Sequence, residues 1–256
     1  MISPLASIHP DARIGDQVEI GPFTSIGADV EVGNGTWIGP NVTIMDGARI
    51  GNDCRIFSGA VLSAIPQDLK FQGESTTVEI GDRSTIRECV TINRGTKAYG
   101  KTVVGKDCLI MAYVHIAHDC ILGDHVILVN SVALAGHVEI GDYAIISGLS
   151  AVHQFVKIGA HVMIGGGAMV RKDVPPFITA AGEPLAYAGV NSVGLKRRNF
   201  SEDEINEIQT LYRTLYQSGM NVSQAVRKIE ETYSKLPVAD AILSFIEQSD
   251  RGLIRK

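Results

Sequence analysis

Aliphatic residues recur at every sixth position along the first two thirds of the chain. The series has 25 positions, seventeen Ile, four Val and four Leu, and runs from Ile8 to Leu62, from Ile80 to Ile92 and from Val104 to Val170. A period of six fits neither an α-helix, which repeats every 3.6 residues, nor a plain strand, which alternates at every second residue. It fits a short strand followed by a corner. The pattern therefore predicts a parallel β-helix of hexapeptide repeats.

Two further positions of the hexad are restricted. The residue after the aliphatic one is Gly in twelve of the 25 hexads. The fifth residue is often small, as in Val18, Thr24, Ala48, Cys54, Cys108 and Cys120. We expect the glycines to serve the geometry of the corners and the small side chains to fill a core too narrow for aromatic rings. The composition agrees, since Gly makes up 27 of 256 residues, above the usual ~7%, and aromatic residues only 6%.

The pattern resembles that of the hexapeptide-repeat proteins, and this resemblance implies a left-handed β-helix in which three hexads, or 18 residues, form one triangular coil. Two polar, turn-rich stretches interrupt the hexads and return the chain in the same phase, at residues 63–79 and 93–103. Loops that leave a regular scaffold without disturbing it are often functional, although a plain surface insertion is the alternative.

The hexads end at Val174, before two prolines, and a link containing Gly, Ala and Pro continues to Asn191. Beyond this link the apolar periodicity becomes helical. We therefore expect a left-handed parallel β-helix over residues 1–190, carrying the two inserted loops, and a helical domain over residues 191–256. The helical domain would cap the end of the β-helix, because solenoids need capped ends.

Three helices are predicted in the C-terminal domain. Ser201 and Glu204 form a capping box for the first, Gly219 can close it, and Pro237 suits the first turn of the third. The apolar faces of the three helices comprise Ile205, Ile208, Leu211, Tyr212 and Leu215, then Val222, Ala225, Val226 and Ile229, then Val238, Ala241, Ile242, Phe245 and Ile246.

Charge and composition narrow the class of protein. With 23 basic and 28 acidic residues the net charge is −5, which argues against a general nucleic-acid binder. No run of 18 apolar residues occurs, so we expect no membrane span. The N-terminus has no secretory-signal pattern, and the four cysteines contain no CxxC pair. We expect a reduced, cytoplasmic protein.

The glycine rule fails where histidines gather. In the eight hexads from Ile110 to Val152, the second position is Gly only twice. The same stretch contains five of the seven histidines, namely His115, His118, His125, His137 and His153. A segment that departs from the structural rule of its repeat while collecting titratable side chains is a candidate site.

Coil stacking suggests which of these side chains meet. In an 18-residue coil, His118 stacks over Gly136 and Gly136 over Gln154, about 4.8 Å apart. Asp119 stacks over His137. A histidine that faces a glycine leaves space for a substrate, and the glycine can present an N–H that no neighbouring coil uses. Since histidine suits general-base chemistry near neutral pH, a catalytic site is the favoured interpretation and a structural cluster the alternative.

Metal binding is the rival interpretation. Hexapeptide proteins of the γ-type carbonic anhydrase class hold zinc with three histidines between subunits, and zinc needs ligands that converge at about 2.0–2.1 Å. His115 and His118 are three residues apart, and the H-x4-H spacing of that class is missing. Neighbouring columns can still converge across an interface, so this possibility stays open.

Two further features each have two interpretations. Gly148 and Gly166 share a column, which indicates either tight packing of coils or the floor of a groove for an alkyl chain. Lys196, Arg197 and Arg198 form a short basic run, which is either a solvated face or a phosphate site, because Arg binds phosphate bidentately.

Longer motifs resemble one family. They are QDLKF (67–71), VEIGDRSTIRECVTINRGT (78–96), HIAHDC (115–120), LAGHVEIGD (134–142), AVHQFVKIGAHVMIGG (151–166), DVPPF (173–177), GLKRRNFS (194–201) and GLIR (252–255). They are similar to motifs of the bacterial UDP-N-acetylglucosamine O-acyltransferases, over essentially the whole chain. The resemblance implies transfer of an (R)-3-hydroxyacyl group from acyl carrier protein to the glucosamine 3-OH of UDP-N-acetylglucosamine, the first step of lipid A synthesis. It also implies a cytoplasmic homotrimer with active sites between neighbouring β-helices, and no cofactor beyond the carrier-protein thioester.

The resemblance implies roles for individual residues. His118 corresponds to the general base, Asp119 to its orienting partner and Gly136 to the oxyanion-hole N–H. Positions that contact substrate are Asp68, Lys70, His115, His137, His153, Gln154, Asn191, Arg197 and Arg198. Gly166 corresponds to the position that sets acyl-chain length, and Met169 could modify the same groove, so the preferred length stays open. Val193 and Pro184 depart from residues found in relatives, at positions that bear on the uridine contacts.

Three other functions remain as alternatives. One is an N-acyltransferase acting on acylated UDP-glucosamine, which usually carries an additional N-terminal uridine-binding domain; the hexads here begin at Ile8. The second is the metal lyase, which bound zinc would favour. The third is a non-catalytic scaffold trimer, which failure to bind either substrate would favour.

Overall fold

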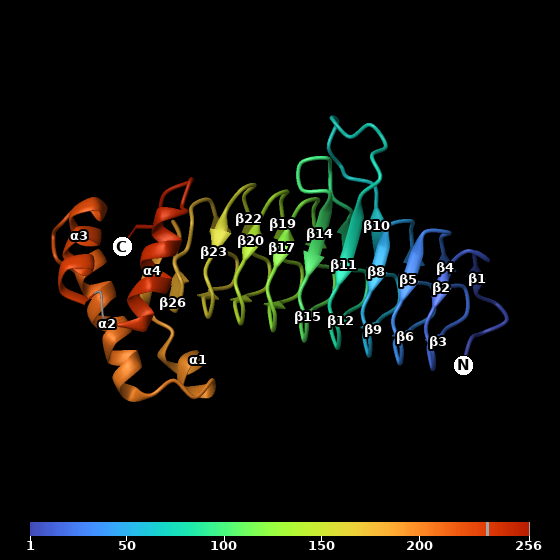
Figure 1. Ribbon diagram of the computed structural model, residues 1–256, viewed down its shortest axis with the longest axis horizontal. Coiled ribbons are helices and arrows are strands. Elements are labelled where there is room, and N and C mark those ends of the chain that lie inside the picture. Colours follow the sequence, from blue (N-terminus) through green and yellow to red (C-terminus); the bar gives the residue numbers. More distant parts are fainter. Residues whose placement is uncertain (234–235, 256) are drawn as a thin grey trace.

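The computed structural model describes residues 1–233 and 236–255. The chain forms a long left-handed parallel β-helix, and four helices cover its C-terminal end while the N-terminus lies at the other end (Figure 1). The predicted fold class is confirmed. None of the described helices is long and apolar enough to cross a membrane.

Three parallel sheets form the walls of the prism. Sheet 1 contains β1 (Ser7–Ile8), β4 (Ser25–Ile26), β7 (Thr43–Ile44), β10 (Val61–Ala64), β13 (Thr91–Asn93), β16 (His115–Ile116), β19 (Ala133–Leu134), β22 (Ala151–Val152) and β25 (Met169–Val170). Sheet 2 contains β2 (Arg13–Ile14), β5 (Val30–Val32), β8 (Ala48–Ile50), β11 (Thr77–Ile80), β14 (Lys101–Val104), β17 (Ile121–Leu122), β20 (Glu139–Ile140) and β23 (Lys157–Ile158). Sheet 3 contains β3 (Glu19–Ile20), β6 (Trp37–Ile38), β9 (Arg55–Ile56), β12 (Thr85–Ile86), β15 (Leu109–Ile110), β18 (Ile127–Leu128), β21 (Ile145–Ile146), β24 (Met163–Ile164), β26 (Ile178–Ala181) and β27 (Ala186–Val190).

The strands keep the predicted register of one coil. His115 pairs with Ala133, and Ala133 with Ala151, so successive partners are 18 residues apart. The aliphatic residue of nearly every hexad is buried in the prism, whereas its neighbour in the strand faces outward. Between β10 and β11, and between β13 and β14, the chain leaves the prism in two loops, residues 65–76 and 94–100, which project on the same side (Figure 1).

The three edges of the prism are called corners here. The first corner, which contains His118, joins sheets 1 and 2; the second, which contains Tyr143, joins sheets 2 and 3; the third, which contains Gly166, joins sheets 3 and 1. The fourth residue of the hexad turns the chain at a corner with a positive φ, for example 57° at Gln17 and 60° at Asp119.

The glycines at the second position of the hexad have another reason, which corrects the expectation of corner geometry. Gly15 and Gly81 do not have a positive φ. A Cβ atom on Gly15 would lie 2.5 Å from Oδ1 of Asn34, and one on Gly81 would lie 2.6 Å from the carbonyl carbon of Gly105. Glycine is required there because the next coil approaches too closely for a side chain.

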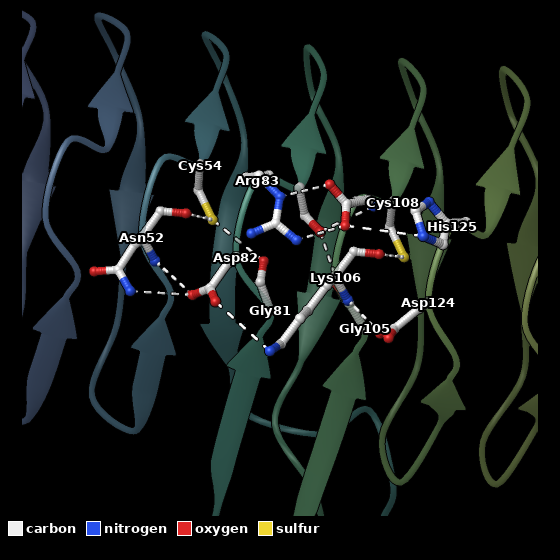
Figure 2. Close-up of polar contacts among 12 residues, drawn as sticks. Asn52, Cys54, Gly81, Asp82, Arg83, Gly105, Lys106, Cys108, Asp124 and His125 are labelled. Atoms are coloured by element: carbon white, nitrogen blue, oxygen red, sulfur yellow. Dashed lines mark hydrogen bonds and ion pairs between the residues drawn. The ribbon is translucent and has the colours of Figure 1, made fainter.

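Polar side chains tie the coils together along the second corner (Figure 2). The backbone N–H of Asn52 donates to Oδ1 of Asp82 at 2.9 Å, and that of Lys106 donates to Oδ1 of Asp124 at 2.7 Å. The buried thiol of Cys108 donates to the carbonyl of Gly123 at 3.2 Å, and burial raises its pKa to about 11. The buried cysteines are therefore core residues with free thiols, as expected from their hexad position.

The link after the last hexad is more ordered than the sequence suggested. Its residues form β26, which continues sheet 3 beside β24, and β27, which pairs antiparallel with β26. These strands lack the hexad pattern, so the pattern could not predict them.

Four helices follow: α1 (Ser192–Arg197), α2 (Glu202–Gln217), α3 (Val222–Tyr233) and α4 (Pro237–Glu247). The capping box of Ser201 and Glu204 is confirmed, and the predicted apolar face of α2 is buried. In α4 the buried alanine is Ala239, and the predicted Ala241 is exposed. The hydroxyl of the buried Tyr212 donates to the carbonyl of Pro176 at 2.5 Å, which joins the helices to the β-helix.

Candidate active site

The first corner places a histidine beside a buried carboxylate. β16 ends at Ile116, and the chain turns through His118 and Asp119 before β17. Nδ1 of His118 lies 2.8 Å from Oδ2 of Asp119. Asp119 is fully buried and His118 is 8% exposed. Because an ionised carboxylate can only accept, Nδ1 carries the proton in this contact, and the lone pair of a neutral imidazole is at Nε2.

Gly136 lies directly beneath the ring of His118. A Cβ atom on Gly136 would lie 2.6 Å from Cε1 and 2.7 Å from Nε2 of His118. The predicted stacking is therefore confirmed, but the space above the glycine is filled by the imidazole itself and not left for a substrate. Within the described residues, the N–H of Gly136 donates no hydrogen bond.

The loop between β13 and β14 holds the carboxylate of Asp119. The N–H of Thr96 donates to Oδ1 at 2.9 Å and its hydroxyl donates to Oδ2 at 2.7 Å, while the N–H of Tyr99 reaches Oδ1 at 3.3 Å. Burial alone would raise the pKa of Asp119, but the hydrogen bonds from Thr96 and His118 outweigh it and lower the pKa. Asp119 is therefore an anion that can stabilise a positive charge on His118.

His137 completes the cluster from the next coil. Its Nε2 lies 3.6 Å from Oδ2 of Asp119, and its ring stacks on Phe155 at 4.5 Å between centroids. The rings of Tyr99 and His118 meet it edge-on at 5.2 and 5.1 Å. Burial lowers the pKa of His137, opposed by the charges of Asp119 and Asp68, so the ring is held neutral. The charge of Asp68 acts on His137, so the loop 65–76 lies close to this cluster.

Other residues predicted to contact substrate lie on elements next to the His118–Asp119 pair. On sheet 1, Nδ1 of His115 lies 2.8 Å from the hydroxyl of Thr91, and burial lowers the pKa of His115. One coil beyond Gly136, His153 is exposed and its Nδ1 lies 3.1 Å from the carbonyl of Gln154. In the loop 65–76, the N–H of the exposed Lys70 donates to Oδ1 of Asp68 at 2.9 Å.

The basic residues after β27 lie at the second corner. The side chain of Asn191 donates to the carbonyl of His161 at 2.9 Å and accepts from the N–H of Gly194 at the start of α1. Nη2 of Arg198 donates to the carbonyl of Tyr143 at 2.9 Å, and its guanidinium lies 5.1 Å from the centre of the Tyr143 ring. Arg197 is exposed.

The candidates for acyl-chain contacts lie at the third corner and on sheet 1. Gly166 is at the third corner, where a Cβ would meet no atom closer than the carbonyl oxygen of Gly148 at 3.6 Å. Coil packing therefore does not require glycine at this position. Met169 is 44% exposed on the outer face of sheet 1. One chain thus distributes the candidate residues over three corners and does not gather them around His118.

The structure also tests the arrangement of a metal site. Donor atoms of His118, Asp119 and His137 lie within 4.8 Å of one another. The three-histidine set of the carbonic anhydrase class is not formed among the described residues, because one donor of this cluster is a carboxylate. Both oxygens of Asp119 also accept hydrogen bonds from Thr96.

Sequence reasoning missed Thr96, Tyr99 and Phe155. None is a histidine, a cysteine or a carboxylate, so a cluster of such residues in the sequence does not reveal them. For Thr96 and Tyr99 the usable signal is the inserted stretch 93–103, which the sequence predicts to be functional without singling out a residue; Phe155 lies in the motif AVHQF.

Two family models match the chain. Residues 29–64 and 101–136 match the bacterial transferase hexapeptide model of six repeats. Together with the fold and the His–Asp corner, this match defines a transferase of the hexapeptide-repeat class. Residues 173–254 match the model of the second domain of UDP-N-acetylglucosamine O-acyltransferases.

Similar proteins give the particular family. The chain is 48% identical to the acyl-[acyl-carrier-protein]–UDP-N-acetylglucosamine O-acyltransferase of Janthinobacterium sp. (strain Marseille), covering 100% of this chain and 99% of that one. It is 59% identical to the protein of that name from Chlorobium phaeobacteroides (98% and 96% covered). The crystal structure of the UDP-N-acetylglucosamine acyltransferase of Bacteroides fragilis 9343 superposes with a TM-score of 0.98 at 51% identity, covering both chains fully. The chain belongs to the family of UDP-N-acetylglucosamine O-acyltransferases and is an acyltransferase.

Proposed function

We propose that this acyltransferase moves an (R)-3-hydroxyacyl chain from acyl carrier protein to the glucosamine 3-OH of UDP-N-acetylglucosamine, as the first step of lipid A synthesis in the cytoplasm. The names of the relatives supply the two substrates. The observation that carries the proposal is the His118–Asp119 pair above Gly136. It combines a base, an anion that orients the base, and a free backbone N–H at one corner.

The proposed reaction is a direct transfer. Nε2 of His118 takes the proton of the sugar hydroxyl while the oxygen attacks the thioester carbonyl carbon. The oxyanion accepts from the N–H of Gly136, the carbon–sulfur bond breaks, and the imidazolium returns the proton to the leaving thiolate. A positioned base typically contributes about 10²–10⁴-fold and an oxyanion donor about 10²–10³-fold. No covalent acyl-enzyme, metal or cofactor is needed in this scheme.

We assign the remaining predicted residues to substrate binding. The part of the substrate near the His118–Asp119 pair would be contacted by His115, His137, His153, Gln154, Asp68 and Lys70. The uridine and phosphates would be contacted by Asn191, Arg197 and Arg198. The acyl chain would pass Gly166 and Met169. The absence of a packing requirement for glycine at Gly166 supports this assignment, because open space there suits an alkyl chain.

We further propose that three copies of the chain assemble around the site. The candidate residues occupy three corners of one prism, so a cleft that contains them all needs more than one copy. The outward positions of sheet 3 supply a surface for association: four consecutive strands present Leu109, Ile127, Ile145 and Met163. The outward positions of sheet 2 are instead rich in charge, as at Glu79, Glu139 and Lys157. In a trimer, sheet 3 of each copy would meet a different face of the next copy, and this head-to-tail contact closes into a ring when successive copies are related by a third of a turn.

One incubation tests the proposed reaction. The protein would be mixed with UDP-N-acetylglucosamine and a panel of 3-hydroxyacyl carrier proteins of increasing chain length, and the products read by mass spectrometry. We expect a UDP-sugar carrying the acyl group in ester linkage at the 3-position, and a clear preference for one chain length. Acylation only of an amine, in a parallel incubation with acylated UDP-glucosamine, would favour the N-acyltransferase and overturn the proposal.

A further inference from the structure

The hydroxyl of Thr96 and the imidazole of His118 share one oxygen atom. Oδ2 of Asp119 lies 2.7 Å from Oγ1 of Thr96 and 2.8 Å from Nδ1 of His118. Both contacts are buried. The other oxygen, Oδ1, accepts from the N–H groups of Thr96 and Tyr99. The two backbone donors therefore hold the carboxylate in place, and the hydroxyl competes with His118 for its charge.

We propose that Thr96 is a positioning residue that sets the basicity of His118 through Asp119. A carboxylate beside a histidine stabilises the imidazolium, so the protonated ring gives up its proton less readily. The Thr96 hydroxyl draws on the same oxygen and weakens this effect. His118 thus remains oriented by Asp119, while the stabilisation of its imidazolium is reduced. The inference rests on the proposed role of His118 as the base.

The loop makes the hydroxyl a strong donor. Oγ1 of Thr96 itself accepts from the N–H of Ala98 at 3.2 Å, and a hydroxyl that accepts one hydrogen bond donates the next more strongly. β14, which follows the loop, is also tied to the corner, since the N–H of Asp119 donates to the hydroxyl of Thr102 at 2.8 Å. The donor is therefore held by the fold before any substrate arrives.

Among the residues that the structure describes, few other groups can set the charge of His118. Asp119 contacts it on its own corner, and His137 meets it edge-on from the next coil. Asp68 acts on His137 from the loop 65–76. The loop 94–100 contributes the neutral hydroxyl of Thr96 and the ring of Tyr99. Its two cations lie against the loop 65–76 instead: Lys97 acts on Glu74, and the guanidinium of Arg94 lies 5.7 Å from the centre of the Phe71 ring. Removal of the Thr96 hydroxyl changes the hydrogen bonds of Oδ2 and leaves these charges in place.

The test is a titration of His118 that needs no substrate. Full-length protein labelled with ¹³C at histidine Cε1 would be titrated by NMR, with the His118 signal assigned from His118→Gln. We expect Thr96→Val to raise the His118 midpoint by about one pH unit and Thr96→Ser to leave it unchanged. An unchanged or lowered midpoint in Thr96→Val would overturn the proposal. Thr96→Ala repeats the measurement if the valine variant does not fold.

A control and a kinetic readout separate this role from a general effect on structure. Thr91→Val removes a comparable contact between a hydroxyl and a histidine, that of His115, and should not move the His118 midpoint. In Thr96→Val the acid limb of the profile of kcat against pH should shift to higher pH, with little change in KM for the UDP-sugar. A loss of kcat equal at all pH values would contradict the proposal. Failure of the wild type to transfer acyl groups would instead contradict the proposed function, while the titration still tests Thr96.

Discussion

At the scale of single residues, burial and one neighbouring charge decide the ionisation of His161. Its ring stacks between Tyr143 and Phe177, at 5.1 and 5.6 Å between centroids, close to Arg198. Burial and the charge of Arg198 lower the pKa of His161 from 6.5 to about 4, although Asp142 opposes them. His161 is therefore neutral near pH 7, and it adds no positive charge beside the candidate phosphate-binding arginine.

This histidine makes the stability of the protein depend on pH. The unfolded chain takes up the proton near pH 6.5, whereas folded His161 does so only near pH 4, so stability falls as the pH drops through this window. His161→Phe removes the effect and keeps the ring stack. Between pH 7 and pH 4.5 we expect its thermal midpoint to fall by about 2–4 °C less than that of the wild type. Replacement of the exposed His9 by Gln is the control; an equal fall in all three proteins would refute the assignment.

At the scale of elements, the hexad pattern predicts the strands of the β-helix and their register, and the helical periodicity beyond residue 201 predicts α2, α3 and α4; β26, β27 and α1 were not predicted. These features follow from local periodicity, which one chain displays directly. The hydrogen bonds from Thr96 to Asp119 could not be predicted in this way, because they depend on how the loop 94–100 folds back on the corner. The reason for the second-position glycines was also out of reach, since it lies in the neighbouring coil and not in the turn itself.

The glycine argument predicts a contrast between two matched substitutions. Gly81→Ala forces a Cβ to within 2.6 Å of backbone in the next coil, so we expect a loss of about 1–3 kcal/mol of stability. Gly166→Ala places its Cβ no closer than 3.6 Å to any atom and should leave the unfolding midpoint unchanged or slightly higher. Thermal unfolding of both variants measures the difference. Equal destabilisation would show that close approach of the coils is not the cause.

At the scale of the whole molecule, the candidate residues meet only if copies of the chain meet. The sequence placed His118, Arg198 and Gly166 in one site through resemblance alone, and spacing along a single chain cannot show which corner faces a neighbour. The structure puts these residues on three different corners. The apolar outward positions of sheet 3 are the physical feature that supports an assembly.

The assembly predicts which surface is sensitive to charge. Ile127→Glu combined with Ile145→Glu places two carboxylates in the proposed interface and should convert the proposed trimer to single chains in sedimentation analysis. Val103→Glu combined with Ile121→Glu, on neighbouring strands of the outer face of sheet 2, is the matched control and should keep the proposed trimer. If the double variant still sediments as the wild type does, sheet 3 is not the interface.

The most direct test of the account is the turnover of His118→Ala. The account predicts that kcat for acyl transfer from 3-hydroxyacyl carrier protein to UDP-N-acetylglucosamine falls by about 10²–10⁴-fold. The variant should retain the circular dichroism spectrum, the oligomeric state and the binding of UDP-N-acetylglucosamine. Turnover close to that of the wild type would contradict the central claim that the His118–Asp119 pair is the base of this acyltransferase.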